Sequence, residues 1–178
     1  MQKLVNNTWL FNILSNDLKS KSKKRILRAI YFSGVSKNQD LKSQIAEFLS
    51  KKDLHIFYQA ARSLGRMNAL EYSERILAGA NLYKQISQDV LVSIFLEFKS
   101  EVCKYLLKRI HIEEVKFQIT IVRIFRHFNF RDAASELQNI LAGTEDKNLI
   151  IEVIKYAGQI ECLSAIETIR EYLNHPNS

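Results

Sequence analysis

The sequence repeats with a period of about 31 residues, and this periodicity constrains the fold more than any other feature. Segments similar to Ala60–Gly65 recur at steps of 30 to 32 residues. Their anchor positions are Gly34, Gly65, Leu96, Arg126 and Gly158. Positions 7, 11 and 15 residues after each anchor are apolar in nearly every copy, which is the spacing of one face of an α-helix. The position four residues before each anchor is also apolar. Each repeat is therefore predicted to be a helix, a short turn and a second helix.

The predicted fold is all-α, a superhelix of five stacked helical hairpins preceded by one additional helix. The predicted helix pairs are 22–34 with 38–50, 53–67 with 70–80, 86–98 with 101–111, 113–128 with 132–142, and 147–159 with 162–173. A single hairpin cannot bury its apolar stripes, so neighbouring repeats must stack. We expect one repeat domain over residues 1–178. The alternative is an irregular helical bundle with an accidental periodicity.

The predicted opening helix, residues 4–18, matches the second helix of a repeat whose first helix is missing. Its leucines, Leu10, Leu14 and Leu18, fall at the repeat's apolar positions. Such a helix is either a native cap or the result of a longer chain being cut inside its array. Trp9 and Ile13 add apolar surface on another side, whereas a terminal helix normally has a polar outer face. This pattern favours a longer parent protein.

Local residues agree with the predicted boundaries. Asn68 and Asn129 are turn formers at equivalent places in two repeats, as is the segment 36–38. Asp53 and Asp146 suit helix starts, where a carboxylate accepts hydrogen bonds from unpaired backbone N–H groups. Gly79 and Gly143 are expected near helix ends, where glycine easily adopts a left-handed conformation. These signals place the turns independently of the apolar pattern.

The runs Ala60–Gly65 and Lys155–Ile160, followed by Leu-x-Ala-Ile-x-x-Ile spacing from Leu163, resemble HEAT repeats of the short, bilin-lyase-like class. The resemblance covers essentially the whole chain. It implies a curved α-solenoid in which the second helices line the concave side. The chain departs from the family pattern because it lacks the aspartate-proline turns and most first-helix arginines. The family specifies a scaffold much better than it specifies a function.

The cysteines, the apolar runs and the N-terminal residues indicate in which compartment the chain is expected. The two cysteines, Cys103 and Cys162, lie far apart at helix-like positions and are expected to be buried thiols rather than a disulfide or zinc motif. The sequence has no apolar run long enough to span a membrane, and its N-terminal residues do not resemble a signal peptide. We therefore expect a cytoplasmic protein, or else the soluble part of a membrane-anchored parent.

The net charge of +7 is concentrated near the N-terminus. Residues 1–66 contain 13 Lys and Arg against 4 Asp and Glu, whereas residues 67–178 contain 13 against 15. The candidate anion contacts are Lys21, Lys23, Lys24, Arg25 and Arg28. Arg62, Arg66 and Arg123 are expected on the same outer side of later repeats. This side is interpreted as a solvated face, with nucleic acid, an anionic membrane surface or an acidic protein as alternative ligands.

No catalytic or metal-binding motif is recognisable in the sequence. Its four histidines do not pair with other ligand residues at metal-binding spacings, and it has no phosphate-binding glycine loop. We predict a non-enzymatic scaffold without a cofactor that binds a protein or peptide. Trp9, Tyr105 and Arg109 are its candidate contacts, because aromatic and arginine side chains dominate binding hot spots. A nucleic-acid-binding or anionic-surface-binding module is the alternative, and a lyase-like or glycosylase-like enzyme rests on family analogy alone.

Overall fold

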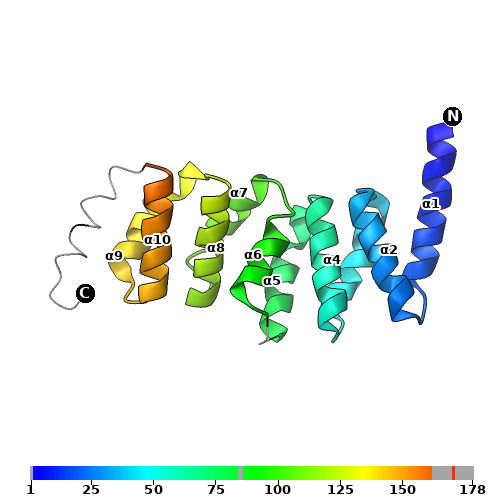
Figure 1. Cartoon of the computed structure of the whole chain (residues 1–178), viewed down its shortest axis with the longest axis horizontal. Helices are drawn as coiled ribbons and strands as arrows, with labels where there is room; N and C mark the ends of the chain where they lie inside the picture. Colours follow the sequence, from blue (N-terminus) through cyan, green and yellow to red (C-terminus); the bar gives the residue numbers. More distant parts are fainter. Residues whose placement is uncertain (1, 84–85, 162–169, 171–178) are drawn as a thin grey trace. The chain divides into compact units, whose positions relative to one another are not determined.

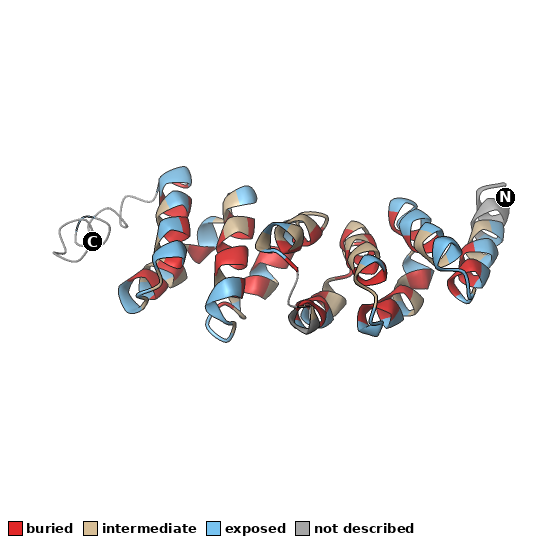
Figure 2. Ribbon diagram, turned by 60° about the horizontal axis from the view of Figure 1, so that its bottom comes forward, coloured by how far each residue is buried: buried red, intermediate tan, exposed pale blue. Residues whose placement is uncertain are grey.

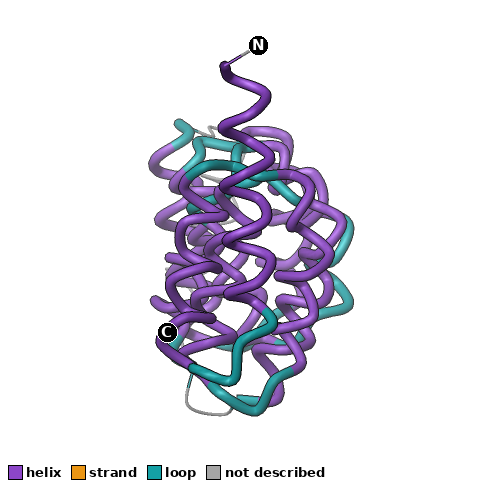
Figure 3. Tube along the Cα trace, turned by 90° about the vertical axis from the view of Figure 1, so that its right-hand side faces the viewer, coloured by secondary structure: helices purple, strands orange, loops and turns teal. Residues whose placement is uncertain are grey.

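The computed structural model describes residues 2–83, 86–161 and 170. The chain divides into two compact units, Met1–Val102 (unit 1) and Cys103–Ser178 (unit 2). Every regular element in the described ranges is helical, and no strand occurs among them (Figure 3). The prediction of an all-α protein is therefore confirmed for the described residues. None of the described helices is both long and apolar enough to cross a membrane.

Unit 1 is built from alternating first and second helices of the repeats. Its helices are α1 (Gln2–Leu18), α2 (Lys23–Val35), α3 (Lys42–Ala46), α4 (Leu54–Arg66), α5 (Ser73–Leu82) and α6 (Gln88–Phe95). The second helices include 3₁₀ turns at Gln39–Leu41, Glu47–Ser50 and Leu70–Tyr72. Helix α7 (Glu101–Leu107) begins in the last residues of unit 1 and continues in unit 2.

The first helices of unit 1 pack directly on one another. Helix α2 lies beside α4, and α4 lies beside α6 (Figure 1). Helix α1 packs on α2 and also on α3, as expected for the second helix of a preceding repeat. Apolar residues close the space between the two sets of helices, including Ile30, Ile45 and Leu64, which are fully buried. Buried residues gather on the helix sides that face neighbouring helices, and exposed residues lie outside (Figure 2).

Unit 2 has the same local organisation. Its remaining helices are α8 (Val115–His127), α9 (Ala134–Gly143) and α10 (Lys147–Gln159), and a 3₁₀ turn at Arg131–Ala133 precedes α9. The first helices α8 and α10 lie side by side. Tyr156 on α10 is buried, and its hydroxyl donates to the carbonyl of Phe130 at 2.7 Å, which links α10 to the turn of the preceding repeat.

Three of the turns share one geometry. Lys37, Asn68 and Asn129 lie three residues after their anchors and have φ between 49° and 53°, in the left-handed region. In each turn the left-handed residue donates its N–H to the carbonyl three residues earlier, and the next residue donates to the carbonyl five residues earlier. This pair of hydrogen bonds is the Schellman arrangement that ends a helix. Glu161, at the equivalent position of the fifth repeat, also has a positive φ.

The observed helices follow the predicted pairs, with the main departures in the third repeat. Helices α6 and α7 are shorter than the predicted ranges 86–98 and 101–111. Asp53 and Asp146 cap α4 and α10 as predicted, because each carboxylate accepts backbone N–H groups. The expectation of left-handed glycines was wrong for Gly79 and Gly143, because no described glycine has a positive φ. The predicted helix 162–173 and Cys162 lie outside the described residues. The expectation of one continuous superhelical domain stays a prediction.

Candidate interaction surface

The basic segment 21–28 forms the turn after α1 and the first half of α2. All five candidate anion contacts are exposed. Three of them pair with acidic residues. Nζ of Lys23 lies 2.6 Å from Oδ2 of Asp53, and Nη2 of Arg28 lies 2.7 Å from Oδ2 of Asp17. Nε of Arg25 lies 3.6 Å from the other oxygen of Asp17.

These ion pairs connect α2 to its neighbouring helices, α1 and α4. Asp17 is buried on α1, so its bonds to Arg25 and Arg28 hold α1 against α2. The hydrogen bond from Lys23 is the largest cause that holds the pKa of Asp53 below its ordinary value. Burial acts in the opposite direction, and the backbone N–H groups of Ile56 and His55 lower the pKa further. Among the described residues, Lys21 and Lys24 are the members of the segment for which no ion pair is seen.

The arginines expected to extend this basic side are partly buried in ion pairs. Glu97, in the turn that follows α6, accepts hydrogen bonds from both Arg62 and Arg66 of α4, the latter at 3.0 Å. Burial raises the pKa of Glu97, but hydrogen bonds from Arg66 and Arg62 outweigh it and hold that pKa below its ordinary value. The two arginines thus join α4 to the turn after α6, and their guanidinium groups are partly buried and paired rather than free in solvent.

A second cluster of this kind lies in unit 2. Glu152 of α10 is 5% exposed and lies 3.3 Å from Arg123 and 3.0 Å from Arg126, both on α8. Lys155 on the same helix as Glu152 contributes a third cation at 3.2 Å. In both clusters, two arginines of one first helix hold a carboxylate of the next repeat, which lies on α10 for Glu152 and in the turn after α6 for Glu97. Arg123 therefore also has an internal structural partner.

The three predicted protein contacts differ in exposure. Trp9 on α1 in unit 1 is 65% exposed. Tyr105 and Arg109 belong to unit 2, and both are partly buried. The guanidinium of Arg109 bonds the carboxylate of Glu113 at 2.9 Å. Trp9 is thus the predicted contact whose side chain is most available to a partner.

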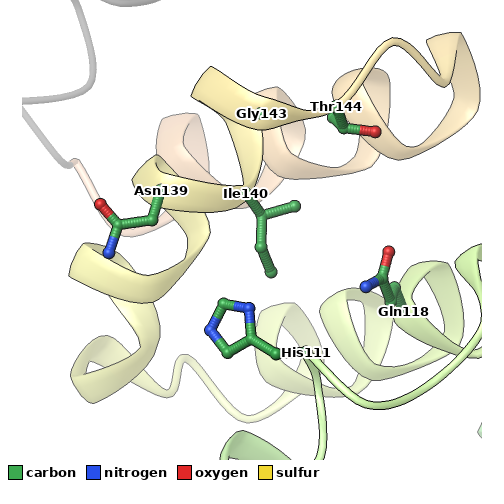
Figure 4. A pocket seen from close by; sticks show the side chains of 6 residues that line it. All are labelled: His111, Gln118, Asn139, Ile140, Gly143 and Thr144. Atoms are coloured by element: carbon green, nitrogen blue, oxygen red, sulfur yellow. The ribbon is translucent and has the colours of Figure 1, made fainter.

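An open pocket of about 430 Å³ lies in unit 2. It is lined by His111, Gln118, Asn139, Ile140, Gly143 and Thr144 (Figure 4). The imidazole Nε2 of His111 lies 2.6 Å from a carboxylate oxygen of Glu136, and Gln118 donates to the carbonyl of Ile110 at 2.9 Å. Two polar side chains that line the pocket, His111 and Gln118, are thus already hydrogen-bonded within the protein. Among the described residues, no group of His, Cys, Asp or Glu side chains is arranged to hold a metal ion.

Four large apolar side chains of α1 and α2, the first two helices of unit 1, are exposed. They are Trp9 at 65%, Ile13 at 38%, Phe32 at 48% and Val35 at 52%. We call this group, with the cations Lys24 and Arg28 on α2, the end face. The sequence predicted Trp9 as a contact and showed Ile13 as additional apolar surface, but it did not single out Phe32 and Val35. Comparison with the equivalent residues of later repeats would have identified Phe32, because its equivalent Ser63 is buried.

The register shows which way Phe32 and Val35 point. Ser63, one repeat after Phe32, is fully buried, and its hydroxyl donates to the carbonyl of Ile30 on the preceding first helix at 2.8 Å. Arg66, one repeat after Val35, lies over the ring of Tyr31 on that same helix, 5.4 Å from its centroid. These positions therefore contact the preceding first helix. At α2 they are half exposed, because no first helix among the described residues of unit 1 packs on that side of it.

The same argument places Trp9 and Ile13. Two repeats after them lie Glu71 and Arg75, which both reach back to the preceding second helix. Glu71 pairs with Lys42 at 2.7 Å, and Arg75 donates to the carbonyl of Ala46 at 2.8 Å. Trp9 and Ile13 thus lie on the corresponding side of α1, although the residues at these positions in the later repeat are exposed and polar.

Sequence comparison matches the chain to no family model and to no curated protein. A function for this chain is therefore inferred from the geometry of the described residues.

Proposed function

We propose that this chain is a HEAT-like helical-repeat module that binds a protein partner and acts as a scaffold rather than as an enzyme. The observation that carries the proposal is the end face, where four large apolar side chains of α1 and α2 are exposed, including Phe32 at a position whose equivalents Ser63 and Ile94 are fully buried. Exposed apolar clusters rimmed by polar residues mark protein interaction sites. Tryptophan is one of the residue types enriched at interaction hot spots.

The other candidate surfaces support binding less strongly. The arginines of α4 and α8 are occupied by Glu97 and Glu152, and Arg109 is occupied by Glu113. His111, in the pocket of unit 2, is bonded to Glu136. The end face thus combines large apolar area with cations that remain accessible.

Affinity capture with the full chain tests the proposal. The bait is compared with a variant carrying serine at Trp9, Ile13, Phe32 and Val35, and with Ile151→Ser as a control, because Ile151 is 47% exposed on α10. We expect proteins that bind the wild type and the control but not the quadruple variant. Circular dichroism of all three establishes that they fold equally. If no protein is retained by the wild type beyond an unrelated bait, the proposal is wrong.

The alternative function is binding of nucleic acid or another polyanion through Lys21 and Lys24, which are exposed and beside the exposed cations Arg25 and Arg28. Phosphate binding by such cations weakens steeply with added salt. Fluorescence anisotropy with labelled single-stranded and duplex oligonucleotides at low salt tests this function. The double variant Lys21→Glu and Lys24→Glu is compared with Lys104→Glu and Lys108→Glu. Equal or undetectable binding by both variants and the wild type rejects the alternative.

A further inference from the structure

We propose that the end face binds an amphipathic α-helix of a partner protein whose apolar stripe is flanked by carboxylates. This inference rests on the proposed function, and it adds the secondary structure and the charge of the partner. The partner helix would lie against α2 at the place that a preceding first helix takes in the later repeats.

The shape of the end face favours a helix. At the position of Phe32, the later first helices carry Ser63 and Ile94, both 0% exposed, and Tyr156, which is 1% exposed. Phe32 itself is 48% exposed. Arg28, Phe32 and Val35 are spaced by four and three residues, so they form one stripe along α2. A stripe of this kind accepts the ridge of a second helix, which is how α4 packs on α2 and α10 packs on α8.

The charge of the end face specifies carboxylates on that partner. In unit 2, the preceding helix α8 presents Arg123 and Arg126 to Glu152 of α10. The residue equivalent to Glu152 on α2 is Arg28, which has the opposite charge. Lys24 lies one helical turn earlier on the same stripe and is exposed. A helix bound to α2 in the manner of α8 on α10 therefore meets cations, and carboxylates are the complementary groups.

Arg28 retains capacity for a second acidic partner. It bonds Asp17 at 2.7 Å, yet its side chain is 58% exposed. A guanidinium has five N–H donors in a planar fork, so it can bind two carboxylates at once. Asp17 additionally holds Arg28 in place, which reduces the entropy lost when a partner binds.

A second copy of this chain docking through its own end face is the less favoured occupant. In a twofold arrangement the same surface meets itself, so Lys24 and Arg28 of one copy would face those of the other. Like charges across an interface oppose association. The phosphates of a nucleic acid would pair with Lys24 and Arg28. They would leave the apolar side chains of the end face without an apolar surface to cover them. An acidic amphipathic helix matches both properties.

Trp9 provides a direct measurement, because it is the chain's single tryptophan and lies in the end face. The probe is a stapled helical peptide of about 20 residues, since shorter free helices are unstable in water. It carries a leucine stripe flanked by glutamates. The matched probe replaces each glutamate with lysine. We expect the acidic probe to shift Trp9 emission to shorter wavelengths with saturation, and the basic probe to bind at least about tenfold more weakly.

Two variants test whether the probe binds at the predicted place. Phe32→Ser introduces the residue found at the equivalent position in α4, and we expect it to weaken binding about tenfold, as at a typical hot spot. Lys24→Glu should weaken binding about fivefold and reduce its dependence on salt. The matched controls are Ile151→Ser and Lys104→Glu, which change an exposed apolar residue and an exposed cation in unit 2. Both controls should bind like the wild type.

Three results would overturn the inference. Equal binding of the acidic and basic probes refutes the charge assignment, and binding unaffected by both variants refutes the site. Self-association that shifts Trp9 emission and is abolished by Phe32→Ser shows that a second copy is the occupant. The proposed function fails separately, through affinity capture without specific proteins. A captured protein that requires the end face but has no acidic helix refutes this inference alone.

Discussion

A Cβ atom placed on Gly34 of α2 would lie 2.7 Å from the Oγ of Ser63 on α4 and 2.8 Å from its Cα. Real Cβ atoms do not approach other atoms this closely, and the Ser63 Cα belongs to the backbone and cannot rotate away. Ser63 also donates its hydroxyl to Ile30, one turn before Gly34. The anchor glycine of the first repeat is therefore required by close packing of two helices rather than by an unusual backbone angle.

The first prediction follows from this contact. Gly34→Ala should lower the free energy of unfolding by about 1–2 kcal/mol, because overpacking outweighs the better helix propensity of alanine. The matched change is Gly158→Ala at the equivalent position of α10, where an added Cβ meets nothing within 4 Å. It should raise stability by up to about 1 kcal/mol. Urea denaturation followed by circular dichroism measures both, and equal effects of the two variants would contradict the packing argument.

The second prediction concerns Glu97, whose bonds to Arg66 and Arg62 hold its pKa below the ordinary value of 4.5. A depressed pKa contributes stability above the ordinary value, and this contribution is lost as the pH falls through the folded pKa. Glu97→Gln should cost about 2 kcal/mol at neutral pH, typical of hydrogen bonds to a charged group. The difference from wild type should shrink below about pH 4.5.

Unfolding free energies measured from pH 7 to pH 3 test this pH dependence. Glu47→Gln is the control, because Glu47 is exposed in the same unit. A wild-type advantage that stays constant across this pH range would show that the Glu97 carboxylate does not titrate as expected.

The third prediction concerns the thiol of Cys103, which is 0% exposed. Burial raises its pKa to about 12, although its own backbone acts in the opposite direction. The thiolate is the nucleophile that attacks thiol reagents, so the folded protein should react at least about a hundredfold more slowly than the protein in urea. The measurement uses a chromogenic disulfide reagent and a Cys162→Ser background. Full labelling of folded protein within the mixing time would refute the burial of this residue.

The repeat register could be read from the sequence because it depends on local properties. Apolar spacing, the turn preference of Asn68 and Asn129, and the capping preference of Asp53 and Asp146 each act within a few residues. These signals agreed with one another, and the helices of the described residues follow them. The third repeat deviates: its equivalent residue, Lys99, does not have a positive φ, and the N–H of Lys99 instead donates to the side-chain oxygen of Asn68.

The candidate site was harder to predict because it depends on contacts between repeats. Arg66 and Glu97 are 31 residues apart, and no local pattern indicates that one holds the other. Phe32 reads as an ordinary apolar residue of α2. Only comparison with Ser63 and Ile94, which are buried at the same register position, shows that its exposure is exceptional. Aligning the repeats by position in the stack, rather than by hydrophobicity alone, would have identified it.

The fourth prediction concerns Lys37, which has φ of 51° at the end of α2. A residue with a Cβ is strained in this left-handed conformation, whereas glycine adopts it without cost. Lys37→Gly should raise the free energy of unfolding by about 1 kcal/mol, because its backbone hydrogen bond to Gly34 is retained. The control is Ser36→Gly, one residue earlier at φ −77°, which should lower stability by contrast. Thermal and urea unfolding compare the two, and stabilisation by both or by neither would show that backbone strain at Lys37 does not limit the stability of this turn.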